Sequence, residues 1–381
     1  MDKTKILALY LPQYYETNYN SDWWVQGYTE WTACKQAIPL FKGHYQPKVP
    51  LNNHYYDLSR KEEIQSQIEM AKKYGIDGFV IYQYYSCNES EYGDKNGIHG
   101  SMLLNKPTEI VRESPKLNIP FCMYWANHDW RKMWFGQNPK MLWPQYYGDE
   151  ADWKEFFLYN LAYFKDNRYI KVNNKPVYFI FAAWHFKEIE KFMDCWNQWA
   201  KENGFDGIFF VKTEDAHTSD QLGQFDAVYR REPFYTFAKG FSKFDFVLRL
   251  LRTRTSKLLN RVLNKVGKGL IGYTCDYDKA WQSIITREDI GPLVIPGAFA
   301  DWDNTARKRY NAQIIKGADP IKFRKYLKLL MDKCCEKQVP FIVINAWNEW
   351  AEGAYLEPDE KNAYAYLEAI ENVQACRRMM G

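Results

Sequence analysis

The chain has 381 residues, of which 46% are hydrophobic and 18% aromatic, and its formal net charge is only +4. This length and apolar content suit one large core of the α/β barrel kind, while the mild charge gives no indication of nucleic-acid binding. Many of the 15 tryptophans and 29 tyrosines must line surfaces, where rings with one apolar and one wet side suit the apolar faces of sugars.

No signal for export, membrane insertion or metal binding is visible. The eight cysteines show no CxxC or other metal-ligand spacing, so we expect reduced thiols and no metal site. The N-terminal MDKTK leads directly into an apolar run, and no apolar run has transmembrane length. These features predict a cytoplasmic protein.

Eight short apolar runs recur along the chain, most of them followed by a helical segment. We expect strands at Lys5–Leu11, Asp77–Gln83, Pro120–Ala126, Pro176–Ala182, Gly207–Thr213, Phe225–Arg230, Leu293–Ala298 and Phe341–Ile344, with helices over Lys61–Tyr74, Trp153–Lys165 and Lys187–Asn203. Strands that alternate with helices predict a parallel sheet, and eight of them favour a closed (β/α)8 TIM barrel over an open sheet. No GxGxxG or P-loop follows any strand.

Two insertions interrupt the barrel pattern. Trp23–Pro50, after the first strand, is long and aromatic, and loops of this length in compact domains are usually functional. Lys239–Lys268, after the sixth strand, holds nine Lys or Arg against one acid, Asp245. From about Phe244 it predicts a basic amphipathic helix or helix pair, either resting on an anionic membrane surface or serving as an ordinary barrel helix with a solvated basic face. We expect one barrel domain over residues 1–381 with an insertion at 239–268, in peripheral contact with the inner membrane.

Chemistry in a barrel collects after the carboxyl ends of the strands, and polar and aromatic residues gather there in this sequence. Some of them have a structural alternative, because residues of a long loop can pack locally and those at 301–304 can cap the next helix. The predicted substrate-binding residues are Tyr10, Gln13, Glu30, Trp31, His44, Tyr82, Tyr84, Trp125, Asn127, His128, Asp129, Trp184, Glu214, Trp302, Asn304, Asn345, Trp347 and Asn348.

The predicted catalytic residues are Glu349 and Glu352, which stand three residues apart just past the last strand. A loop or a first helical turn there can direct both carboxyls into one pocket. Glycosidic-bond chemistry needs such a pair, with one carboxyl protonated to assist the leaving oxygen and the other ionised. The alternative interpretation is the start of a capped helix, with the acids at the positive end of its dipole.

Five stretches in chain order carry a resemblance to a known family. They are WWVQGYTEWTACKQAIPLFKGHYQPKVP, YYDL followed by YGIDGF, PFCMYWANHDWRKMW, DWDNTARKR and INAWNEWAEGAYLEPD. Together they resemble the WbsX family, bacterial proteins of O-antigen and other surface-polysaccharide gene clusters that are described as glycosyltransferases. Members of this family carry a domain similar to glycoside hydrolase family 99, the endo-α-mannosidases and endo-mannanases.

The resemblance implies a (β/α)8 barrel and a retaining mechanism that needs no metal and no cofactor. In the similar hydrolases one glutamate takes the proton of the sugar's own 2-hydroxyl, which attacks the anomeric carbon and forms a 1,2-anhydro sugar. The other glutamate protonates the leaving oxygen and then activates the acceptor. The matching Asn-Glu-Trp-x-Glu motif implies that Glu349 is the base and Glu352 the general acid/base. This chain departs from its relatives after the third strand, where WANHDW replaces the usual WANENW.

We therefore expect a retaining glycan-active enzyme of cell-surface polysaccharide synthesis, acting on an oligosaccharide or lipid-linked glycan. Endo-α-mannosidase-like hydrolysis is the alternative, because no phosphate-cradling motif for a sugar nucleotide is visible in the sequence. A second alternative is a non-catalytic glycan-binding protein that kept the barrel.

Overall fold

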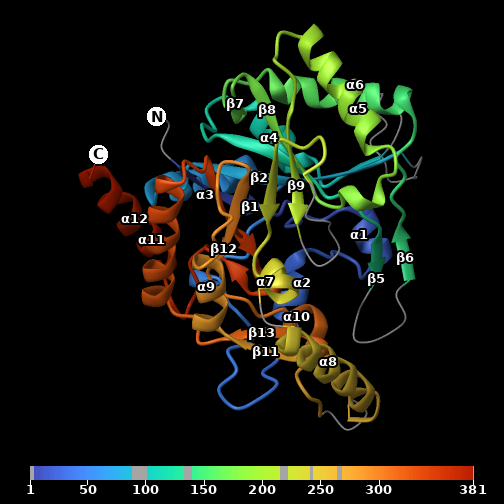
Figure 1. Cartoon of the computed structure of the whole chain (residues 1–381). Helices are drawn as coiled ribbons and strands as arrows, with labels where there is room; N and C mark the ends of the chain where they lie inside the picture. The colour runs from blue at the N-terminus through green and yellow to red at the C-terminus, as the bar shows by residue number, and fades with distance from the viewer. Residues whose placement is uncertain are drawn as a thin grey trace.

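Eight parallel strands close into a barrel in the computed structural model, which describes residues 4–87, 101–132, 140–214, 222–240, 243–263 and 268–380 (Figure 1). The strands are β1 (Lys5–Tyr10), β2 (Gly78–Ser86), β4 (Phe121–Trp125), β8 (Lys175–Ile180), β9 (Phe209–Glu214), β10 (Ala227–Arg230), β12 (Val294–Phe299) and β14 (Phe341–Asn345). Each pairs in parallel with the next, and β14 pairs with β1 to close the sheet. The (β/α)8 barrel and its eight predicted strands are confirmed.

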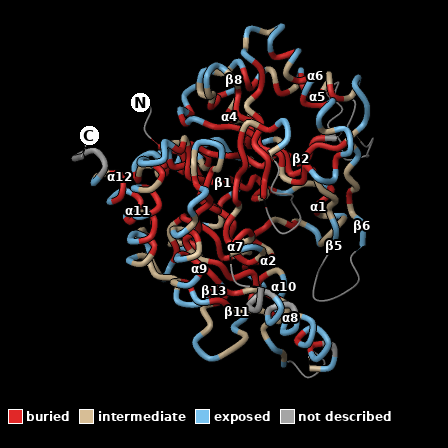
Figure 2. The backbone as a smooth tube through the Cα atoms, viewed as in Figure 1, coloured by how far each residue is buried: buried red, intermediate tan, exposed pale blue. Residues whose placement is uncertain are grey.

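The strands form where the sequence has continuous apolar runs, because a barrel strand is buried on both faces. All nine residues of β2 are buried, as are all five residues of β4 and of β14. Figure 2 shows the buried residues concentrated in the strands and on the inner sides of the helices. β2 extends three residues beyond the predicted Gln83, so Tyr82 and Tyr84 lie on the same face of one strand.

Helices cover the outside of the barrel. They are α3 (Lys61–Lys73), α4 (Lys106–Glu113), α5 (Glu150–Phe164), α6 (Ile189–Glu202), α9 (Tyr277–Ile285), α11 (Pro320–Glu336) and α12 (Ala365–Met380). α5 begins three residues before the predicted Trp153, because the Asp149 side chain caps its first turn by accepting from the backbone nitrogens of Ala151 and Asp152. Between β9 and β10 the described residues contain no helix.

The two predicted insertions contain helices of their own. The first begins at the last residue of α1 (Asn18–Trp23) and holds α2 (Glu30–Lys35), and η1 (Leu51–Asn53) follows it. After β10 come α7 (Phe234–Lys239) and α8 (Lys243–Leu263), and α8 extends away from the barrel at the bottom of Figure 1. The predicted basic helix is thereby confirmed, although residues 241–242 and 264–267 of the insertion lie outside the described residues. No helix in the described part of the chain is both long and apolar enough to cross a bilayer.

Short elements in the connecting loops complete the fold. Three two-stranded sheets are β5 (Trp130–Lys132) with β6 (Lys140–Trp143), β11 (Tyr273–Asp276) with β13 (Gln313–Lys316), and β15 (Asn348–Glu349) with β16 (Ala354–Tyr355). β3 (Ser101–Leu103) and β7 (Lys171–Val172) add antiparallel pairings to β2 and β8, and the remaining turns are η2 (Ala183–His185), α10 (Thr305–Lys308), η4 (Arg309–Asn311) and η5 (Trp350–Glu352). Several of these loop elements line the cavity described next.

Candidate active site

A cavity of about 1120 Å³ lies at the carboxyl ends of the strands, the end where barrel enzymes carry their chemistry. Residues of β2 and of the segments after β1, β4, β8, β10, β12 and β14 line it. Such a volume exceeds that of most drug-sized pockets and accommodates more than one sugar ring.

Glu349 and Glu352 enter the cavity from a tight turn after β14. Glu349 ends the short strand β15, and Glu352 ends the single 3-10 turn η5, which Gly353 closes at φ 63°. Only glycine fits there without strain, because a Cβ would also stand 2.9 Å from the backbone nitrogen of Asp303. That nitrogen donates to the Glu352 carbonyl at 2.8 Å. The acids therefore do not begin an α-helix, and the alternative of a capped helix start is wrong.

Asn348 fixes the base of this turn against the first strand. Its side-chain oxygen accepts from the Leu11 nitrogen at 2.7 Å, and its amide donates to the Leu11 carbonyl at 2.9 Å. The Tyr14 hydroxyl donates to the Asn348 carbonyl. These bonds join the carboxyl ends of β14 and β1, so that the position of Glu349 is set by buried backbone contacts.

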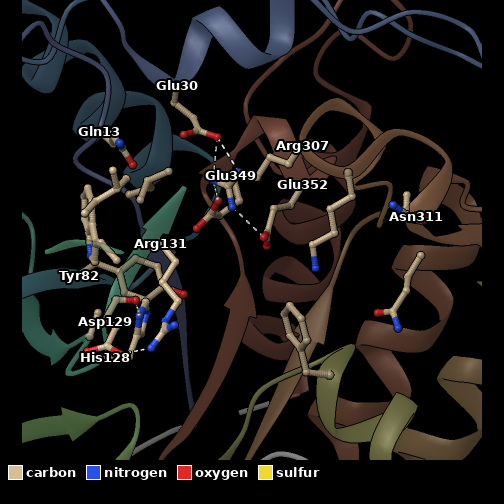
Figure 3. Close-up of a pocket in the computed structure, with 18 of the residues that line it drawn as sticks. Gln13, Glu30, Tyr82, His128, Asp129, Arg131, Arg307, Asn311, Glu349 and Glu352 are labelled. Atoms are coloured by element: carbon tan, nitrogen blue, oxygen red, sulfur yellow. Dashed lines mark hydrogen bonds and ion pairs between the residues drawn. The ribbon is translucent and has the colours of Figure 1, made fainter. Parts of the chain in front are cut away.

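Arg307 holds three carboxyl groups together in the cavity (Figure 3). Its Nη1 donates to Glu352 at 2.7 Å, its Nη2 to Glu349 at 3.1 Å, and its Nε to Glu30 at 2.8 Å. Glu30 is 2% exposed and starts α2, and its backbone nitrogen donates to the Gln13 carbonyl. One guanidinium thus fixes the two predicted catalytic groups relative to each other and to the first insertion.

Glu349 has an altered acidity. Burial raises its pKa to about 8, while Arg307 opposes this shift and the nearby Glu352 and Glu30 add to it. Glu349 therefore holds a proton at neutral pH, and once ionised its carboxylate is a stronger base than an ordinary glutamate. A pKa near the working pH suits a general base.

The structure brings part of the predicted site together. Eight of the predicted residues line the cavity, namely Gln13, Glu30, Tyr82, Tyr84, His128, Asp129, Glu349 and Glu352. The other twelve are absent from its lining: Tyr10, Trp31, His44, Trp125, Asn127, Trp184, Glu214, Trp302, Asn304, Asn345, Trp347 and Asn348. Of these twelve, Trp184 has the largest exposure, at 36%.

The polar groups outside the lining bond to protein instead. The Tyr10 hydroxyl donates to Gln67 at 2.7 Å, His44 Nε2 lies 2.7 Å from Asp303, and Glu214 pairs with Arg230 at 3.2 Å. Tyr10 and Glu214 end their strands and His44 lies in the first insertion, as the sequence indicated, but none of their side chains lines the cavity. Side-chain direction depends on the exact strand end, which apolar patterns fix only to within a few residues.

Five cationic residues of the cavity lining were not predicted: Arg131, Arg231, Lys257, Arg307 and Lys308. Arg307 and Lys308 belong to the DWDNTARKR stretch, and Arg231 directly follows the predicted sixth strand. Lys257 lies in the basic insertion. Arg131, Arg231, Arg307 and Lys308 follow predicted strands, so a search for basic residues beyond strand ends would find them.

A (β/α)8 barrel with a carboxyl pair, one member buried and one partly exposed, in its carboxyl-end cavity belongs to the class of barrels found in glycan-acting enzymes. The chain belongs to the family described as Glycosyltransferase WbsX, whose model matches residues 6–370. It is 27% identical over 369 residues to the protein WxcX of Xanthomonas campestris pv. campestris, covering 96% of this chain and 48% of WxcX. WxcX of strain B100 matches with the same identity over 373 residues. The chain thus spans about half the length of these relatives.

The barrel also resembles solved structures of glycoside hydrolases. The GH99 endo-α-mannosidase from Bacteroides thetaiotaomicron superposes with a TM-score of 0.54 at 13% identity, covering 98% of this chain and 97% of that one. A glycoside hydrolase-like protein matches with a TM-score of 0.54 at 12% identity, covering 98% and 94%. At these identities the likeness establishes a shared fold, and together with the family membership it supports a glycan-acting enzyme.

Proposed function

We propose that this chain is a retaining glycan-active enzyme that transfers a sugar during synthesis of a cell-surface polysaccharide of the O-antigen kind. The observation that carries the proposal is the pair Glu349 and Glu352, held by one guanidinium in a cavity at the carboxyl end of the barrel. Family membership supports sugar transfer as the reaction class. Hydrolysis of a glycan of the endo-α-mannosidase kind is the second candidate, supported only by the shared barrel.

In the proposed mechanism both glutamates move protons and neither bonds to the sugar. Ionised Glu349 removes the proton of the 2-hydroxyl, whose oxygen attacks the anomeric carbon as the bond to the leaving oxygen breaks and Glu352 protonates that oxygen. Glu352, now ionised, then takes the proton of the acceptor hydroxyl, which opens the 1,2-anhydro sugar, and Glu349 returns its proton to the 2-oxygen. Two inversions at one carbon give net retention, as in other substrate-assisted enzymes.

The other lining residues suit recognition of the sugar. Tyr82 and Tyr84 present neighbouring rings on one strand, with centroids 6.3 Å apart. Asp129 accepts from the Gln145 nitrogen at 3.0 Å and from Arg131 at 2.8 Å, so its carboxylate is already oriented. Gln13, Glu30 and His128 would supply further polar contacts to hydroxyls. Substrate contacts from the twelve predicted residues outside the cavity lining would be indirect.

A product assay tests the reaction. Purified protein is incubated with lipid-linked oligosaccharide from its host, with and without candidate sugar donors, and the products are read by mass spectrometry. Transfer predicts a product heavier by one sugar that requires a donor and disappears in Glu352→Gln. A lighter product formed without donor would identify a hydrolase. Glycan binding by the native protein without any turnover would identify the non-catalytic alternative.

We further propose that α8 rests on an anionic membrane surface. Its buried side is polar, with Ser256 and Asn260 turned inward, whereas its exposed side is apolar. Four aliphatic residues recur there at helical spacing and form one stripe: Val247 (49% exposed), Leu251 (55%), Leu258 (62%) and Val262 (69%). Leu248 and Leu259 widen this stripe. Exposed Arg252 and Arg254 flank this stripe. An apolar surface with arginines at its edges fits the boundary between lipid tails and anionic head groups.

Replacing Leu251, Leu258 and Val262 with serine is expected to weaken binding to phosphatidylglycerol-containing vesicles by at least about tenfold, because less apolar surface enters the bilayer boundary. Vesicle flotation measures this. Leu158→Ser with Leu329→Ser is the matched control, since these leucines are exposed on α5 and α11. Arg252→Gln with Arg254→Gln should weaken binding to anionic vesicles and leave binding to neutral ones unchanged. Native protein that does not float with any vesicle would contradict the membrane proposal.

A further inference from the structure

The cavity is lined by more cationic side chains than its carboxyl groups pair with. Arg307 is bonded to three acids, and Arg131 pairs with Asp129 at 2.8 Å. The remaining cationic groups of the lining are Arg231, Lys257 and Lys308, and none of them has a carboxylate partner within ion-pair distance among the described residues.

These three cations come from separate segments and line the same cavity. Arg231 follows β10, Lys257 is an exposed residue of α8 that also lines the cavity, and Lys308 ends α10. Lys308 is exposed overall, but the protein around its ammonium displaces water and lowers its pKa, and the nearby charge of Glu352 opposes this shift. The positive charges of Arg307, Lys257 and Arg231 lower it further, so Lys257 and Arg231 both lie near enough to Lys308 to repel it.

Arg231 is the most strongly fixed of the three. Its guanidinium lies 3.9 Å from the ring centre of Phe234 and 4.7 Å from that of Phe181. Contacts of this kind use the faces of the guanidinium, whereas its N–H donors lie in its plane. Its Nε is buried without a hydrogen-bond partner. A buried, unsatisfied donor on a charged group destabilises the fold, unless a ligand supplies an acceptor.

We infer that Arg231, Lys257 and Lys308 form a subsite for the diphosphate group of a sugar donor or of a lipid-linked glycan. This inference rests on the proposed function, since it places the diphosphate beside Glu352, where a sugar bond would be broken or formed. Three cations match the several charges of a diphosphate better than the single charge of a sugar carboxylate. The same helix that offers Lys257 to the cavity exposes its apolar stripe on the other side. A diphosphate between a sugar at the glutamates and a lipid at α8 would fit this arrangement.

No phosphate-binding motif marks this subsite in the sequence, because its members are 26 to 77 positions apart and belong to different segments. A P-loop binds phosphate with consecutive backbone nitrogens, which a local pattern reveals. Here side chains from three separate segments would do so, and only the closed barrel brings them into one cavity.

Isothermal titration of the full chain with inorganic diphosphate tests the subsite. We expect binding that is at least about tenfold tighter than that of sulfate, and about tenfold weaker in each of Lys257→Gln and Lys308→Gln. Lys337→Gln is the matched control, since this exposed lysine ends α11 at the opposite end of the barrel. Arg231→Gln should abolish diphosphate binding. If the Arg231→Gln variant does not fold, the two lysine variants still test the subsite.

Two further ligands separate the sources of the diphosphate. A nucleoside diphosphate that binds more tightly than inorganic diphosphate points to a nucleotide-sugar donor. A short polyprenyl diphosphate that binds more tightly, and loses this gain in Leu251→Ser with Leu258→Ser, points to a lipid-linked glycan. Native protein that binds diphosphate no better than sulfate, or a double lysine variant with native affinity, would overturn the inference. A uronic acid that binds more tightly than diphosphate would overturn it as well.

The test of the diphosphate subsite and the test of the proposed reaction can succeed or fail independently. Diphosphate binding requires no turnover, and Glu352→Gln should retain it. Binding without turnover of any glycan would support the subsite and contradict the proposed reaction. Turnover by a protein that does not bind diphosphate would support the reaction and contradict the subsite.

Discussion

Replacing Glu349 with glutamine is expected to lower glycan turnover by about a thousandfold or more while the barrel stays folded. Glutamine keeps the shape of the protonated side chain but cannot accept a proton from the sugar 2-hydroxyl, and general acid/base groups contribute about 10²- to 10⁴-fold. Single-turnover kinetics with the substrate found in the product assay measures the loss, and circular dichroism reports the fold.

Glu357→Gln provides the matched control for this variant. Glu357 is also buried, and burial likewise raises its pKa to about 8. Its Oε2 accepts from Trp350 Nε1 at 2.6 Å and from the Tyr56 hydroxyl at 2.8 Å, and it does not line the cavity. Turnover by Glu357→Gln should stay within a few fold of the native value. Equal losses in both variants would indicate that Glu349 matters for structure and not for chemistry.

The pH dependence distinguishes the two proton roles of Glu349. As a base it must first lose its proton, so kcat/KM should rise with pH through about 8 and then level off. A decrease above about 8 would instead assign it the acid role.

The stability of the fold should also depend on pH through Glu349, but it should fall over the pH range in which turnover rises. The unfolded chain ionises Glu349 near 4.5 and the folded chain only near 8, so its contribution to stability is complete below 4.5 and is lost as the pH rises to about 8. As the pH rises from 4.5 to about 8, the melting temperature of the native protein should therefore fall relative to that of Glu349→Gln.

Replacing Arg307 with glutamine is expected to reduce both turnover and stability strongly. Three carboxyls, of Glu30, Glu349 and Glu352, would lose their shared cation. Removing one partner of a buried ion pair typically costs about 3–5 kcal/mol, and because the Arg307 side chain is 31% exposed we expect a smaller loss, on the order of 2 kcal/mol. Turnover should fall by at least about a hundredfold, since the two catalytic groups are no longer held in place.

Urea unfolding and steady-state kinetics measure these effects. Arg307→Lys should keep part of the stability and little of the turnover, because an ammonium provides charge without the fork that spaces the two glutamates. Arg324→Gln on α11 is the control for loss of an exposed arginine. An Arg307→Gln variant with native stability and kinetics would show that the three carboxyls need no shared cation.

The sequence by itself determined the barrel and the position of the glutamates. Runs such as KILALY and FIVIN are buried on both sides in the barrel, so continuous apolar character marks each strand without reference to its partners. Glu349 and Glu352 were found for the same local reason, because chemistry in a barrel follows the end of a strand. The sequence also predicted the basic character of α8. It did not predict which face of this helix packs against the barrel.

Only the tertiary structure decided which residues share the cavity. Arg307 meets Glu30 across 277 positions and Glu349 across 42, and no local pattern records such a meeting. Trp302 and Trp347 follow the ends of β12 and β14 as expected, yet both are completely buried and neither lines the cavity. Arg231, Lys257 and Lys308 looked like ordinary basic residues in three different segments. Their common cavity exists because the barrel closes, which is the collective result of eight strand pairings and not of any single stretch of the chain.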